Sequence, residues 1–201
     1  MEFWDKEVTD ASWKTLLQLN KKVKFVLIGG WAVYLYTHLE KSKDIDIVVD
    51  YDALKLIADT YDLHKNQKLS KYEVKTERFD IDIYVPHYSK LTVPTEDIIN
   101  MTRSVEGFVL PIPEILLILK LGAFIDRRDS IKGQKDTVDI LGLLLYSDLD
   151  TKLLKTLCDK YVIDYRLIKT IIKDADEDTL GYLGTNRHYF SKAKKQLLSQ
   201  F

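Results

Sequence analysis

The sequence has few of the features that mark secreted, zinc-binding or membrane proteins. It contains a single cysteine, Cys158, so no disulfide can form within the chain. Its four histidines, at positions 38, 64, 87 and 188, lack the spacing of metal ligands on one helix face, which argues against a zinc site. No apolar run reaches the length of about 18 residues that spans a membrane, and there is no leader pattern. We expect a soluble, cytoplasmic protein without a membrane partner.

An excess of charge of either sign is also missing. The 30 lysines and arginines nearly balance the 31 aspartates and glutamates, which gives a formal net charge of -1. The whole molecule therefore has no field that would hold it against nucleic acid, and a polyanion would have to bind a local patch. With 46% apolar and 30% charged residues, the 201-residue chain has the composition of a globular protein that can bury one core.

The period of the apolar residues changes along the chain. Up to about residue 110, short β-branched runs alternate with stretches of helical spacing, and beyond it helical spacing prevails. We predict an α+β (α/β) fold, with a small mixed β-sheet core flanked by helices over residues 1–110. A helical C-terminal region, residues 111–201, should pack on that core.

The expected elements follow from the same patterns. Strands are predicted at residues 23–28, 45–49, 71–76 and 78–86, with a short edge strand within 106–113. Helices are predicted at residues 31–39, 50–63, 113–128, 135–148, 150–161, 164–175 and 188–200.

The most informative stretch is "FVLIGGWAVYLYTHLEKSKDIDIVVD". Its first apolar run ends at Gly29 and Gly30, and Asp44 and Asp46 stand one residue apart in the second. Residues i and i+2 of a strand point to the same side, so the two carboxylates project together. A strand that only fills a core has no use for them, because ionised carboxylates stay out of apolar interiors unless a positive group pairs with them.

The run "FDIDIYV" repeats this alternation with Asp80 and Asp82. If the two strands are neighbours, three or four carboxylates converge on one end of the sheet. Such a cluster suits Mg²⁺ or Mn²⁺, which bind carboxylate oxygens and keep positions open for water and phosphate. A glycine pair between strand and helix lets phosphate approach backbone N–H groups. Each feature alone is commonly a tight turn or a solvated strand face, and their combination favours a site for metal and triphosphate.

The stretch "IGGWAVYLYTHLEKSKDIDIVV" resembles the signature of the DNA polymerase β-type nucleotidyltransferase superfamily. In that signature a Gly-Gly or Gly-Ser turn and a helix precede an Asp-x-Asp strand, and a third acidic residue lies on a later strand. The Gly-Gly-x-Ala form, Ser42 before Asp44, and the later "KDTVDILGLLL" are similar to AbiEii/MenT-like nucleotidyltransferases. The core motif covers residues 25–50, and a looser likeness extends to about residue 145.

The resemblance implies the metal ligands and catalytic residues. Asp44 and Asp46 would bind Mg²⁺ or Mn²⁺, usually as two ions together with a nucleoside triphosphate. Asp82 would be the third ligand, because it precedes the short apolar run "IYV", and it would assist deprotonation of the nucleophile. Asp80 points the same way and is the alternative third ligand.

The resemblance also implies the nucleotide contacts. Gly29 and Gly30 would form the phosphate-cradling turn, with Ser42 nearby, although Gly30 leaves no hydroxyl where the commoner form has serine. Lys120 lies in an apolar helix face, where it either extends its stem across apolar surface or contacts triphosphate. Lys135 is expected to bind nucleotide or acceptor phosphate.

The segment "DRRDSIKGQKDTVDI" is interpreted as a glycine-containing turn that carries Lys132 and Lys135, followed by a helix that starts with Asp136 and Asp139. Asp139 is expected to pair with a cation or to form the wall of the site. Cys158 is expected in the core of its helix.

The expected reaction transfers a nucleoside monophosphate from an NTP such as ATP to an acceptor hydroxyl, with release of pyrophosphate. The residues leave the acceptor open among RNA such as tRNA, a protein and a small molecule, and the resemblance implies a toxin-like enzyme with an antitoxin partner. Two alternatives stay open: a catalytically degenerate nucleotide-binding or toxin-antitoxin interaction module of the same fold, and a metal-dependent phosphoesterase.

Overall fold

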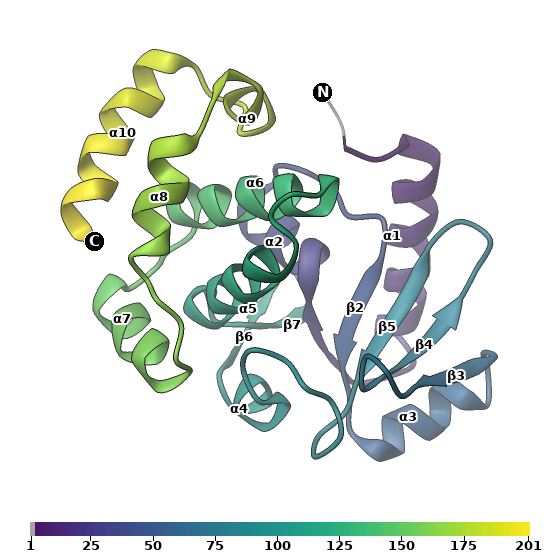
Figure 1. The fold of residues 1–201 in the computed structure, drawn as a ribbon. Coiled ribbons are helices and arrows are strands. Elements are labelled where there is room, and N and C mark those ends of the chain that lie inside the picture. The colour runs from purple at the N-terminus through teal and green to yellow at the C-terminus, as the bar shows by residue number, and fades with distance from the viewer. Residues whose placement is uncertain (1–2) are drawn as a thin grey trace.

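The short apolar runs of the first half form a five-stranded mixed sheet in the computed structural model, which describes residues 3–201 (Figure 1). Its strands are β1 (Val26–Ile28), β2 (Ile45–Val48), β3 (Leu63–Asn66), β4 (Lys71–Lys75) and β5 (Asp80–Tyr84). Their order across the sheet is β1-β2-β5-β4-β3. β2 and β5 run parallel, and the other neighbours are antiparallel. The predicted mixed sheet is confirmed.

Four helices belong to the same half of the chain: α1 (Lys6–Asn20), α2 (Gly29–Thr37), α3 (Tyr51–Ala58) and α4 (Thr95–Asn100). Two further strands, β6 (Thr102–Val105) and β7 (Phe108–Pro111), pair with each other in a separate two-stranded sheet. β7 also lies against β1. The predicted edge strand therefore exists, and its pairing partner is β6.

Strand alternation separates the core from the polar face of the sheet. On β5 the side chains of Ile81 and Ile83 are buried, while Asp80, Asp82 and Tyr84 on the other side stay partly exposed. Successive side chains of a strand point to opposite faces, so this pattern places the apolar residues in the core and the acidic residues together. The interpretation of "FDIDIYV" as a strand with one acidic face is confirmed.

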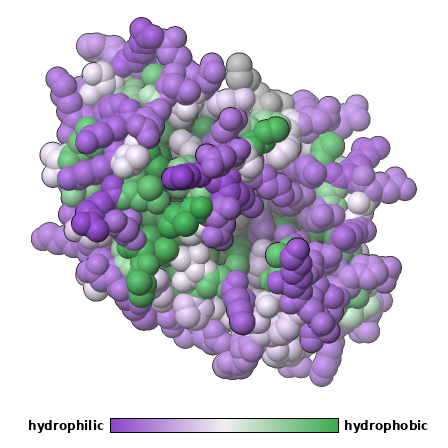
Figure 2. Space-filling view, in the orientation of Figure 1, coloured by the Kyte–Doolittle hydropathy of each residue, from purple (hydrophilic) through white to green (hydrophobic). Residues whose placement is uncertain are grey.

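All elements after β7 are helical: α5 (Pro113–Arg127), α6 (Ile131–Tyr146), α7 (Thr151–Lys160), α8 (Leu167–Asp174), α9 (Glu177–Tyr182) and α10 (Arg187–Gln200). α5 and α6 pack on each other and on α2. α7, α8 and α10 lie on the side of the molecule away from β3 and β4 (Figure 1). On the face of the molecule seen in Figure 1, polar side chains cover much of the surface, and apolar groups gather over the C-terminal helices (Figure 2). No helix within residues 3–201 is long and apolar enough to span a membrane.

Some elements lacked a clear sequence pattern. Along α1 the buried positions include Thr9 and Ser12 as well as Leu16 and Leu19, so its apolar stripe is short. The segment 63–66, "LHKN", is poor in β-forming residues and becomes β3 because it pairs with β4. α3 accordingly ends earlier than predicted. α4, β6 and α9 were also not predicted.

Candidate active site

The carboxylates meet where β2 and β5 run side by side. Asp46 stands opposite Asp82 in the parallel register. Asp44 lies just before β2, and its Oδ1 accepts a hydrogen bond of 3.2 Å from the backbone N–H of Asp80. Asp44, Asp46 and Asp82 line one cleft, whereas the side chain of Asp80 is not part of its lining. The geometry thus brings together the three predicted carboxylates, and it places Asp82, but not the side chain of the alternative Asp80, in the cleft.

Gly29 joins the end of β1 to α2 directly beside these carboxylates. Its φ is +68°, in the left-handed region that favours glycine. A Cβ atom on Gly29 would stand 2.1 Å from Oδ2 of Asp46. Glycine is therefore required here for two reasons, and its bare backbone lets the N-terminus of α2 approach the carboxylate.

Gly30, at the same turn, packs closely against Ser42. A Cβ atom on Gly30 would stand 2.6 Å from Oγ and 2.8 Å from Cβ of Ser42. The buried Ser42 thus fills the space that a serine at position 30 would need, and its hydroxyl donates a hydrogen bond of 3.1 Å to the backbone oxygen of Asp44. A hydroxyl is therefore present beside the turn even though residue 30 is glycine.

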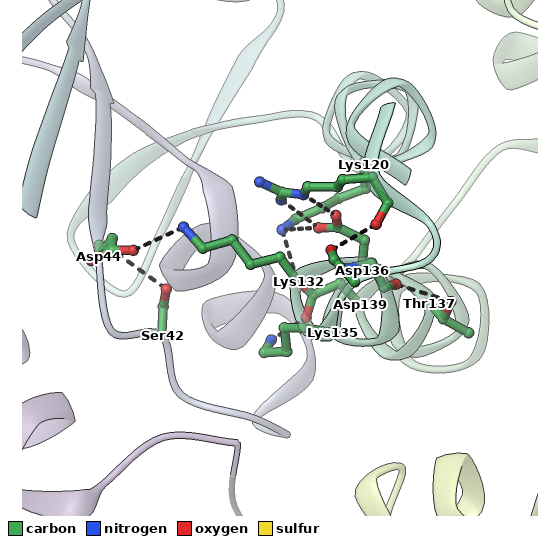
Figure 3. A network of polar contacts seen from close by, with 11 residues as sticks. Ser42, Asp44, Lys120, Lys132, Lys135, Asp136, Thr137 and Asp139 are labelled. Carbon is green, nitrogen blue, oxygen red and sulfur yellow. Dashed lines mark hydrogen bonds and ion pairs between the residues drawn. The ribbon is translucent and has the colours of Figure 1, made fainter. Parts of the chain in front are cut away.

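The opposite wall of the cleft comes from α5 and α6 (Figure 3). Lys120 on α5 lies with its Nζ 3.1 Å from Oδ1 of Asp136 and 2.7 Å from Oδ2 of Asp139. Lys135 pairs with the same Asp139 one turn along α6. Burial alone would lower the pKa of Lys120, but the negative charges of Asp139 and Asp136 outweigh it and raise that pKa. Lys120 is therefore a charged, buried member of an ion network and does not snorkel.

Arg127 and Lys132 complete this wall. Arg127 donates two hydrogen bonds to Asp136, of 2.8 and 3.0 Å, in a bidentate arrangement. Lys132 reaches across the cleft, and its Nζ lies 3.6 Å from Oδ2 of Asp44 (Figure 3). Through this contact α6 is linked to the carboxylate side of the cleft.

The predicted glycine turn around Lys132 is wrong, because α6 begins at Ile131. Ser130 caps this helix, and its Oγ accepts a hydrogen bond of 3.1 Å from the backbone N–H of Gly133. A Cβ atom on Gly133 would stand 2.3 Å from the carbonyl oxygen of Arg127. The glycine therefore serves the close packing of α6 on the end of α5 and not a turn, and Asp136 and Asp139 lie inside the helix.

The electrostatic state of the carboxylates follows from their crowding. Burial and the neighbouring charge of Asp82 raise the pKa of Asp46 from 3.8 to about 6. Burial also raises the pKa of Asp82, against the effect of Lys71, whose Nζ lies 2.5 Å from Asp82 Oδ2. The second oxygen of Asp82, Oδ1, is buried and accepts no hydrogen bond. The cleft is therefore short of positive charge at Asp46, whereas Asp82 has Lys71 beside one of its two oxygens.

This deficit bears on whether the residues fit a metal ion. Within residues 3–201, no three Asp, Glu, His or Cys side chains form a ready-made metal site. Lys132 and Lys71 instead stand beside Asp44 and Asp82. The unpartnered Asp82 oxygen and the raised pKa of Asp46 still suit a hard cation, which binds carboxylate oxygens. Asp44, Asp46 and Asp82 are the residues that could hold it.

This geometry agrees with the comparison against protein families. The family described as nucleotidyltransferases of unknown function (DUF6036) matches residues 7–176. The chain belongs to this family. The matched range contains the carboxylates, the glycine turn and both helices of the opposite wall. The comparison with curated proteins gives no match.

Among solved structures, three similar chains cover nearly the whole nucleotidyltransferase-family chain. JHP933 from Helicobacter pylori is 20% identical with a TM-score of 0.49, covering 98% of this chain and 95% of that one. A putative nucleotidyltransferase from H. pylori is 16% identical, with a TM-score of 0.44 and coverages of 98% and 99%. An antigenic nucleotidyltransferase-like protein from Paracoccidioides brasiliensis is 15% identical, with a TM-score of 0.45 and coverages of 95% and 93%.

Several residues in or beside the cleft of this protein were not predicted as site residues. Tyr84 lines the cleft two residues after Asp82, and the same alternation rule would have placed it there. Asp136 was expected only as a helix-starting acid, yet it binds both Lys120 and Arg127. The contact of Lys71 with Asp82 had no sequence signal, because it depends on the pairing of β4 with β5.

A second cavity of about 220 Å³ adjoins the cleft of this nucleotidyltransferase-family protein. The two share part of their lining: Asp46, Tyr84, Lys120 and Arg127. The rest of the second cavity is more apolar and includes Leu91, Thr92, Leu116, Leu119 and Ala123, with Lys90 and Asp126. A charged cleft and a less polar cavity thus meet at Asp46.

Proposed function

We propose that this protein is a metal-dependent nucleotidyltransferase that moves a nucleoside monophosphate from an NTP to an acceptor hydroxyl and releases pyrophosphate. The observation that carries the proposal is the opposition of Asp46 and Asp82 beside the Gly29 turn, in a cleft whose far wall carries Lys120 and Lys135. Carboxylates on one side and fixed cations on the other are what a metal-bound triphosphate requires.

The phosphate groups would lie between the turn and the α5–α6 wall. Backbone N–H groups at the start of α2 would donate hydrogen bonds to phosphate oxygens, and the hydroxyl of Ser42 would do so after turning away from the backbone oxygen of Asp44. Lys120, Lys132 and Lys135 would neutralise the charge that the leaving pyrophosphate gathers. Because Lys120 and Lys135 are held in place by Asp136 and Asp139, these two lysines need little reorganisation when the nucleotide binds.

The nucleophile would be activated from the carboxylate side. Asp82 Oδ1 has no hydrogen-bond partner and is the oxygen we assign to accept the proton of the acceptor hydroxyl. The acceptor oxygen then bonds to the α-phosphorus, the bond to the pyrophosphate oxygen breaks, and the proton stays on Asp82. A divalent cation held by Asp44, Asp46 and Asp82 would supply charge neutralisation of the triphosphate and of the attacking oxygen.

The test is transfer of label from α-labelled NTPs, with Mg²⁺ or Mn²⁺, into a crude pool of RNA and protein. Asp46→Asn and Asp82→Asn should abolish metal-dependent labelling, whereas Asp80→Asn, whose side chain lies outside the cleft lining, should retain it. The labelled fraction identifies the acceptor class, and the AbiEii/MenT-like resemblance favours RNA or protein. Labelling that persists in Asp46→Asn would refute the proposal.

A second candidate is a nucleotide-binding module of the same fold without turnover. The lysines beside Asp44 and Asp82, together with the lack of a ready-made three-ligand group in residues 3–201, favour it over a hydrolase. Such a module would bind an NTP tightly and release no pyrophosphate. Measuring pyrophosphate in the same incubations separates the two candidates.

A further inference from the structure

Lys71 holds one of the three carboxylates of the cleft. Its Nζ lies 2.5 Å from Oδ2 of Asp82 and 3.6 Å from Oε2 of Glu73. The side chains of Lys71 and Asp82 are only 11% and 18% exposed. Lys71 opens β4, the strand that pairs with β5 on the side away from β2 (Figure 1). A cation that does not line the cleft therefore pairs with one of its carboxylates.

Three strands keep this lysine in place. Glu73 stands opposite Asp82 in the β4–β5 register, and its carboxylate also pairs with Lys75 at 3.3 Å. From β3, Asn66 donates a hydrogen bond of 3.2 Å to Oε2 of Glu73. Because Glu73 is fixed by these partners, Lys71 lies between two carboxylates of set position and is not a mobile surface side chain.

The consequence concerns the charge that a metal ion would meet. Asp82 Oδ2 already faces a full positive charge at contact distance, and such a pair is screened little where water is scarce. A divalent cation that binds Asp82 must displace this ammonium group or approach beside it. Either event loses part of the free energy that the carboxylate would otherwise give to the metal.

We propose that Lys71 is a built-in counter-cation that competes with the divalent metal ion for Asp82. This inference rests on the proposed function. By lowering the affinity of the cleft for a bare ion, Lys71 makes metal binding depend on a nucleoside triphosphate, which brings its own oxygen ligands. In the metal-free protein, Lys71 also compensates part of the negative charge of Asp82.

The competition can be measured by Mn²⁺ binding without nucleotide, following free Mn²⁺ by its EPR signal. Lys71→Gln removes the charge but keeps an amide that can donate to Asp82, so the variant should fold. Its dissociation constant for Mn²⁺ should fall roughly tenfold, within the range of coupling that contacting charged groups show. The matched control is Lys75→Gln on the same strand, whose side chain is 63% exposed and whose screened charge should matter less than about twofold.

Asp82→Asn makes the test specific and independent of how Lys71→Gln folds. In the otherwise unchanged protein it should weaken Mn²⁺ binding less than it does in the Lys71→Gln protein, because Lys71 already offsets part of the charge of Asp82. In the Lys71→Gln background it should cancel the gain. An equal gain in Lys71→Gln and Lys75→Gln, no gain in Lys71→Gln, or the same loss from Asp82→Asn with and without Lys71 would overturn the inference. Absence of Mn²⁺ binding in every variant, even with added NTP, would overturn the metal-dependent function as well.

Discussion

Asp46 and Asp82 stand opposite each other on the parallel strands β2 and β5, so two carboxylates share one side of the cleft. Burial of Asp46 and its repulsion by Asp82 raise the pKa of Asp46 to about 6. An arrangement that costs folding free energy near neutral pH is consistent with a role in binding a cation or a reacting group.

Asp46→Asn should stabilise the metal-free protein at pH 8. The pKa of Asp46 is raised above its ordinary value of 3.8, so its contribution to folding is fully present below about pH 4 and is lost as the pH rises through about 6. The variant lacks this loss and should gain up to about 3 kcal/mol in unfolding free energy at pH 8. Urea unfolding at a series of pH values measures the difference, which should disappear near pH 4. A difference that does not vary with pH would contradict the assignment.

Gly29→Ala should lower both stability and label transfer. The new methyl group would be placed at positive φ and 2.1 Å from Asp46 Oδ2, so the carboxylate has to move. The backbone strain alone costs about 1–2 kcal/mol. Gly107→Ala is the matched control, because Gly107 also has positive φ, +81°, but nothing lies within 4 Å of its added Cβ. Comparable loss of transfer in both variants would show that strain, and not the displaced carboxylate, is responsible.

Gly30→Ser alone should lower stability and label transfer, and adding Ser42→Gly should restore both. The serine Cβ at position 30 would overlap Ser42, whereas the double exchange moves the hydroxyl from one side of the same space to the other. The single variant should lose about 1–3 kcal/mol through overpacking, and the double variant should regain most of it. Thermal unfolding and label transfer of both variants provide the measurement. A double variant no better than Gly30→Ser would show that the two positions do not share this space.

Lys120→Met should destabilise the protein more than Lys132→Met does. Lys120 is buried against Asp136 and Asp139, and its loss leaves negative charge that Arg127 and Lys135 compensate only in part. The expected cost is on the order of 3 kcal/mol.

The matched variant, Lys132→Met, removes a half-exposed side chain and should change stability by less than about 1 kcal/mol. Both lysines line the cleft, so both variants should bind triphosphate more weakly. Equal stability of the two proteins would mean that the ion network around Lys120 contributes no net stability.

Local patterns were enough to predict the strands that carry the carboxylates and, except for α9, the helices that follow residue 113. Period-two alternation placed Asp44 with Asp46, and Asp80 with Asp82, on one face each. Helical spacing found α5 through its apolar stripe. The region around Gly133 was misread as a turn, because its glycine serves the contact between α5 and α6, which no local pattern reports.

What the sequence by itself determined is which carboxylates share a strand face, because side-chain direction in a strand alternates with residue number. Only the tertiary structure decided that β2 lies next to β5, that Ser42 fills the space at Gly30, and that Lys71 reaches Asp82. Those relationships join residues far apart along the chain, and they depend on strand order and register. Strand order and register are set by how the whole core packs.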